Sequence, residues 1–245
     1  MLGRAAWVRL TPERRGLAMT EIGSLRTLAA LAAALLLGGC NLVVSETPVF
    51  NTADAAGAPP LKPGIWAAPQ PNCDFKPSTP LAEWPKCAGG AEITPTAIIA
   101  AADPSVLASP DQGAPAAAKT MKVPYVLAAG DPRILQIHFV LPIDPAIKAA
   151  FYYFIALRPI AHDADGRITD AEAWLIQCGP PPPPSADSSG KADQGGLTSH
   201  PLPGMTVTKG ECNPTDKAAV INAALPSRAW AGDQVGTLHW VRDGK

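Results

Sequence analysis

Apolar and polar residues alternate in two stretches near the middle of the chain, 123–127 and 134–140. A period of two residues is typical of a strand that buries one face. Gly130 and Asp131 stand between the stretches, and a pair that begins with Gly fits a two-residue type II′ turn. The pattern therefore predicts a β-hairpin.

A second hairpin has the strongest signal, with strands expected at 151–159 and 168–178. Asp165-Gly166 lies between them and favours a type I′ turn. A turn at this dipeptide would pair Leu157 with Trp174, Ile155 with Ile176, and Tyr153 with Cys178. A shift by one residue would instead place Ala156 opposite Trp174 and mix large with small side chains. We therefore expect the first register, with these six side chains on one face.

A helix is expected after Cys212. Asn213 and Pro214 fit the N-cap and the first helical position, and Asp216 would lie in the first turn, where the helix dipole favours a carboxylate. Spacings of three and four residues predict an apolar stripe facing the core, made of Ala218, Ile221 and Leu225. Pro226 is expected to end the helix.

These patterns predict an α+β fold that is mainly β, in which one or two short helices pack on an antiparallel sheet of hairpins. Alternation over 237–242 predicts the last strand. We expect a single globular domain at 64–245. Few large apolar residues occur from 40 to 63, so this segment is expected to be a flexible tether.

A Pro-rich loop, 179–211, interrupts the domain. Its five consecutive prolines, 180–184, predict a polyproline II rod, either as a stiff spacer or as a ligand for an aromatic groove. Trp66 and Trp84 lie in short segments bounded by proline. We expect both indoles to pack in the core, the alternative being an exposed aromatic surface for sugar or peptide.

The N-terminus has the layout of an export leader. Residues 28–37 are apolar, follow Arg26, and precede two glycines and Cys40. Ten residues rise only about 15 Å as a helix, roughly half the hydrocarbon core of a bilayer. A basic region, a short apolar core and small residues before the cleavage site predict a signal peptide at 1–39. Met19 offers an alternative start.

Leu37-Gly38-Gly39-Cys40 resembles the lipobox of bacterial lipoprotein precursors. The resemblance implies that a diacylglycerol is attached to the Cys40 thiol, that the leader is cut before it, and that the new amino group is acylated, for example with palmitate. Two or three acyl chains would hold the protein on a lipid bilayer permanently. Asn41 stands where an Asp would resemble an inner-membrane retention signal, so the resemblance implies the outer membrane, with the protein facing the periplasm.

The charge balance argues against a nucleic-acid partner. The whole chain has a net charge of −1, and removal of a leader with five Arg and two Glu leaves 15 basic and 19 acidic residues. Neutralising phosphates needs a concentrated positive field, which this balance does not provide. The sequence also contains no Gly-rich phosphate-binding motif, so we expect no nucleotide cofactor and assign no cofactor of any kind.

Four cysteines remain after Cys40, and an even number in an oxidising compartment favours two disulfides. Of the three possible pairings we expect Cys73 with Cys87 and Cys178 with Cys212, since each joins neighbours across a loop. Zinc binding is the alternative. The four histidines are dispersed and no Cys-x-x-Cys pair exists, so the spacing does not favour a metal.

Asp163, Asp165 and Glu172 fall on the spacing of an EF-hand calcium loop. The first ligand position is occupied by Ala161, and strands rather than helices are expected on both sides. We therefore expect a solvated hairpin turn and keep calcium binding as the weaker alternative.

Catalysis has no clear signature, since no Gly-x-Ser-x-Gly motif occurs. His138 and His239 lie in expected strands, and either could act as a base if it faced a cleft beside a carboxylate and a hydroxyl.

The expected function is that of a non-catalytic envelope lipoprotein that binds an envelope protein or the cell wall, or has a structural role. The alternatives are a periplasmic hydrolase with an unrecognised active site, and an envelope-displayed enzyme inhibitor that uses a loop such as 179–211.

Overall fold

The computed structural model describes residues 41–101, 120–144, 147–182, 185–186, 192–193, 196–208 and 210–244. The strands are β1 Val44–Ser45, β2 Gly64–Ala67, β3 Ala91–Ile93, β4 Ala97–Ala101, β5 Thr120–Ala128, β6 Arg133–Asp144, β7 Ile147–His162, β8 Ile168–Leu175, β9 Ser185–Ala186, β10 Ala192–Asp193, β11 Met205–Thr208, β12 Glu211–Pro214 and β13 Gly236–Arg242. The α-helix is α3 Lys217–Ala231, and the short 3-10 helices are η1 Thr52–Ala55, η2 Leu81–Glu83, η3 Lys86–Ala88 and η4 Gly232–Gln234.

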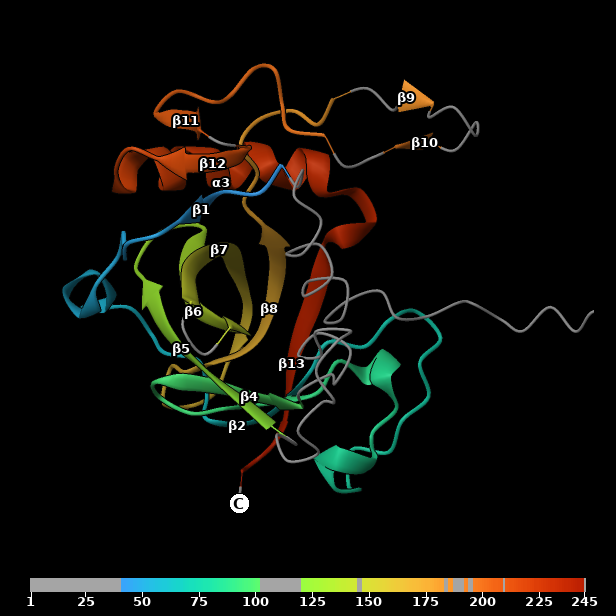
Figure 1. Cartoon of the computed structure of the whole chain (residues 1–245). Coiled ribbons are helices and arrows are strands. Elements are labelled where there is room, and N and C mark those ends of the chain that lie inside the picture. The colour runs from blue at the N-terminus through green and yellow to red at the C-terminus, as the bar shows by residue number, and fades with distance from the viewer. Residues whose placement is uncertain are drawn as a thin grey trace, which may run out of the picture.

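Eight antiparallel strands close into a barrel in the order β2-β3-β4-β5-β6-β7-β8-β13, because β13 pairs with both β8 and β2 (Figure 1). The first seven follow one another along the chain. The excursion after β8 contains β11, β12 and α3, which lie together above the barrel in Figure 1. The expected mainly β, antiparallel fold with a helix is confirmed, and the closure of the sheet into a barrel is the more specific finding.

The barrel strands bury side chains on two faces. One buried cluster includes Trp66 of β2, Leu135 of β6 and Leu157 of β7, and residues from every barrel strand lie in it or pack against it, so this cluster fills the interior. A second cluster joins Ile134 and Phe154, on the opposite face of β6 and β7, to the small residues of α3. An eight-stranded barrel is just wide enough for side chains to fill it.

The hairpin expected from 123–127 and 134–140 is confirmed, since Tyr125 pairs with Ile137 and Leu127 with Leu135. The expected two-residue turn at Gly130-Asp131 is wrong, because the pair nearest the turn is Ala128 with Ile134 and the connection is longer. This connection contains the cis peptide bond between Asp131 and Pro132.

The register expected for the second hairpin is wrong by one residue. Trp174 lies opposite Ala156 instead of Leu157. The connection is longer than a two-residue type I′ turn. The Gly166 N–H donates a hydrogen bond to the Asp163 carbonyl, and the Gly166 backbone is in the left-handed region at φ 78°. Both faces of these strands are buried, so Leu157 fills the barrel while Trp174 packs under α3. Large side chains therefore do not need to share a face.

The helix begins and ends later than expected. Its N-cap is Asp216, whose side chain accepts a hydrogen bond from the Ala219 N–H, whereas Asn213 and Pro214 belong to β12. Pro226 lies inside the helix. Proline cannot donate a backbone hydrogen bond at this position, and the residues on either side of it, Ala224 and Ser227, are fully buried.

The expected core stripe of the helix is also wrong. Ala218, Ile221 and Leu225 are exposed. The face packed on the barrel consists of Ala219, Val220, Ala223, Ala224, Ser227 and Ala231. Small side chains let the helix axis approach the strands closely, and this contact outweighs the greater hydrophobicity of Ile221 and Leu225.

The segment expected to be a flexible tether is part of the domain from residue 41 onward. Val43, Phe50 and Leu61 are almost fully buried. The buried Gln136 side chain accepts hydrogen bonds from the N–H groups of Val49 and Phe50, both at 2.8 Å, and donates to the Phe50 carbonyl at 2.9 Å. Few but well-placed apolar residues are therefore enough to fix 41–63 on the barrel.

Candidate functional site

The junction with the expected anchor is the first candidate site. Cys40 and the whole leader lie outside the described residues, and the described chain starts at Asn41. The Asn41 carbonyl accepts a 2.8 Å hydrogen bond from the Cys178 N–H, and the Asn41 amide donates to the Gly179 carbonyl at 2.5 Å. The Thr198 N–H in turn donates to Asn41 Oδ1 at 3.2 Å. The residue after the expected lipidation site is thus held by two segments, residues 178–179 and Thr198.

A disulfide reinforces this junction. Cys178 and Cys212 are bonded with a Cα–Cα distance of 5.8 Å, and Val43 forms a bridge with Cys212. The second bond joins Cys73 and Cys87, whose Cα atoms are 5.6 Å apart. Both expected pairings are confirmed.

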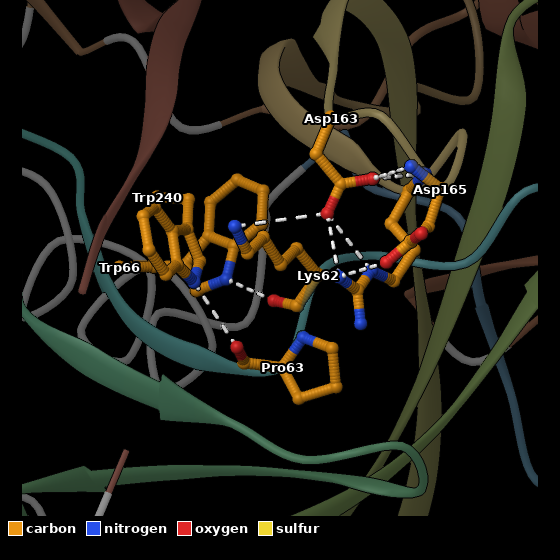
Figure 2. Close-up of polar contacts among 7 residues, drawn as sticks. Lys62, Pro63, Trp66, Asp163, Asp165 and Trp240 are labelled. Carbon is orange, nitrogen blue, oxygen red and sulfur yellow. Dashed lines mark hydrogen bonds and ion pairs between the residues drawn. The ribbon is translucent and has the colours of Figure 1, made fainter. Parts of the chain in front are cut away.

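The second candidate site is an aromatic cluster at the start of β2 (Figure 2). The Trp66 indole donates to the Lys62 carbonyl at 2.8 Å, and the Trp240 indole donates to the Pro63 carbonyl at 3.0 Å. The Lys62 ammonium lies 3.7 Å from the centre of a Trp240 ring and 3.6 Å from an Asp163 carboxylate oxygen. A side chain at Gly64 would collide with Trp240, so glycine is required for this contact.

The cluster closes the barrel rather than presenting a binding surface. Trp66 is only 2% exposed, and both indole N–H groups are satisfied by main-chain carbonyls. Trp84 is buried as well and packs 4.7 Å, centre to centre, from Phe75. The expectation that Trp66 and Trp84 pack in the core is confirmed.

The carboxylates of the calcium alternative are engaged by cations. Arg167 bonds Asp163 at 2.9 Å and Asp165 at 2.6 Å. Burial raises the pKa of Asp163, but hydrogen bonds and charge from Arg167 outweigh this effect and hold that pKa below its usual value.

Glu172 is directed to a different partner, Arg228 of α3, at 2.7 Å. The hydrogen bond from Arg228 is the main reason why the pKa of Glu172 is lowered. Across the described ranges, no group of three His, Cys, Asp or Glu side chains is placed to hold a metal ion.

The two candidate histidines contact different residues. His239 Nδ1 is 2.6 Å from Asp170 Oδ1, and the His239 side chain is 46% exposed. His138 stacks on Tyr152 with 4.6 Å between ring centres. Neither Asp170 nor Tyr152 was expected as a partner, because these contacts depend on strand registers that join residues distant in the chain.

The loop proposed for an inhibitor is described only in part. The disulfide closes it as expected, and β11 lies in its second half and pairs with β12, which begins at the last residue of the loop. Residues 183–184, 187–191, 194–195 and 209 lie outside the described residues.

Comparison of the chain with protein-family models, with curated proteins and with solved structures finds no match. Within the described part of the chain, none of the helices combines the length and the apolar character needed to cross a membrane.

Proposed function

We propose that this protein is a bacterial envelope lipoprotein, exported by a leader at 1–39 and anchored through acylated Cys40. One observation carries the proposal: the chain has five cysteines, and the four after position 40 form two disulfides. Cys40 therefore has no partner cysteine left in the chain. Paired thiols are typical of an oxidising compartment, and an unpaired cysteine that ends a lipobox-like sequence suits acylation.

The barrel domain then acts as a non-catalytic module at the outer membrane, facing the periplasm, that binds an envelope protein or the cell wall. Supporting this role, apolar side chains from all eight strands occupy the barrel interior. Two ion pairs also have a structural role: Lys217 pairs with Asp54, and Arg228 pairs with Glu172. Both pairs tie α3 to the rest of the domain.

Metabolic labelling with palmitate tests the anchor. The wild-type chain expressed in a bacterium should incorporate label and sediment with membranes, and Cys40→Ser should do neither. Cys73→Ser is the matched control, since it removes a thiol that belongs to a disulfide and should keep the label. A soluble, unlabelled wild-type product would contradict the proposal.

The hydrolase alternative keeps one supporting observation, the contact between His239 and Asp170. A carboxylate that orients an imidazole is two-thirds of a catalytic triad. A serine-reactive fluorophosphonate tests it on the mature protein. Labelling that is lost in His239→Ala and retained in His138→Ala would favour the hydrolase over the non-catalytic module.

A further inference from the structure

The outer face of α3 is mostly apolar. Four of its exposed positions, Ala218, Ile221, Leu225 and Ala229, recur at spacings of three and four residues, and the fifth is Asn222. Ile221 is 46% exposed and Leu225 is 52% exposed. A helix with one side in water normally carries charged residues on that side.

The charged side chains of α3 do not cover this stripe. The 15-residue helix has two of them, Lys217 and Arg228. Lys217 bonds Asp54 at 2.6 Å, and Arg228 bonds Glu172 at 2.7 Å. Both are therefore directed to partners on other elements, and the outer face keeps an apolar character that a partner could cover.

The described chain starts beside this helix. Asn41 accepts the Cys178 N–H, while the neighbouring Gln177 N–H donates to Ser227 Oγ on the inner face of α3 at 2.8 Å. Of these two consecutive residues, Cys178 contacts the start of the described chain and Gln177 contacts the helix. Because Asn41 is fixed, no flexible linker separates position 40 from the domain.

We propose that the outer face of α3 docks on the same bilayer that holds the acyl chains of Cys40. This inference rests on the proposed lipid anchor. Asn41 contacts Cys178, and the adjacent Gln177 contacts the inner face of α3. A helix is about 10–12 Å across, so the plane of its outer face lies about one helix diameter beyond this contact. A cysteine extended by a thioether-linked glycerol can span such a distance. Helices with one apolar face bind in the interfacial plane of a bilayer, and the anchor keeps this face at a high local concentration of lipid.

Spin labels measure this contact directly. Leu225→Cys places a single nitroxide on the stripe, and Ile160→Cys is the matched control because Ile160 is a 59% exposed isoleucine near the turn at the other end of β8. Each label has a unique thiol, since Cys40 is acylated and the other four cysteines are bonded. The acylated protein is placed in vesicles of phosphatidylethanolamine and phosphatidylglycerol, and collisions with a water-soluble nickel chelate and with oxygen are compared.

The label at 225 should lose several-fold of its accessibility to the chelate and gain accessibility to oxygen, while the label at 160 stays in water. Leu225→Glu, with the label moved to the stripe position 221 by Ile221→Cys, should restore accessibility to the chelate, whereas Ile160→Glu should not.

Failure of the anchor and failure of the docking face give different results. If mass spectrometry finds no acyl chains, the anchor is wrong and the docking face falls with it. If the acylated protein shows equal accessibility at 225 and 160, only the docking face is wrong. Protection of the label at 225 without vesicles would also overturn the docking proposal. Spectral broadening between labels would then show that a second copy of the protein covers the stripe. Protection seen only in the uncleaved precursor would show that the apolar leader covers it.

Discussion

The indole of Trp174 donates a 2.7 Å hydrogen bond to the main-chain carbonyl of Ala224, and this bond joins β8 to α3. Trp174 is 1% exposed and lies opposite Ala156, so its ring occupies the space that the small residue leaves under the helix. The helix is therefore positioned by a large side chain from the barrel, while its own contact residues are mostly alanines.

Trp174→Phe should lower the free energy of unfolding by about 2 kcal/mol, because it removes a buried hydrogen bond and leaves a void. Chemical denaturation followed by circular dichroism measures the loss. Trp84→Phe is the comparison, since its indole bond is longer at 3.2 Å and only partly buried. Equal stability of Trp174→Phe and the wild type would contradict this role.

Gln136→Met should lower the free energy of unfolding by about 3 kcal/mol, since it leaves two N–H groups and one carbonyl of 49–50 unpaired. The segment 41–63 should resist limited proteolysis in the wild type and become sensitive to it in this variant. Gln234→Met changes an exposed glutamine and should leave both measurements unchanged. Rapid cleavage of the wild type in this segment would restore the tether interpretation.

The two disulfides should differ in their contribution to stability. Replacing Cys73 and Cys87 by Ala should cost about 3 kcal/mol, and replacing Cys178 and Cys212 nearly 4 kcal/mol, because these pairs close loops with sequence separations of 14 and 34 residues. Denaturation without reductant measures both losses. The reverse order would show that loop length does not govern them.

The pair of Glu172 and Arg228 should make stability depend on pH in the acid range. The folded pKa of Glu172 is lowered, so its stabilisation is fully present above the ordinary value of 4.5 and is lost as the pH falls through the folded pKa. The difference in unfolding free energy between the wild type and Glu172→Gln should therefore be largest near neutral pH and shrink in acid. A difference that is constant from pH 7 to pH 3 would show that the carboxylate has the same pKa in both states.

Local sequence signals determined the hairpin strands, the neighbours joined by disulfides, and the existence of a helix before the last strand. Each of these depends on local patterns: alternation at 123–127 and 134–140, cysteines that are neighbours in the sequence, and a helical spacing of apolar residues after Asn213 and Pro214. The export leader and the lipobox at Cys40 are also local signals, and they remain predictions.

Tertiary structure alone decided which faces are buried. The register at Trp174 and the buried stripe of α3 were both mispredicted for the same reason: the barrel strands have a filled interior on one side and a helix on the other. The sequence pattern was interpreted as placing all large side chains in one core. In the structure Leu157 lies in the barrel interior and Trp174 lies in the second cluster, under α3. The close fit of small residues against the barrel then leaves Ile221 and Leu225 outside, since dispersion contacts depend on how surfaces meet and not on the hydrophobicity of one segment.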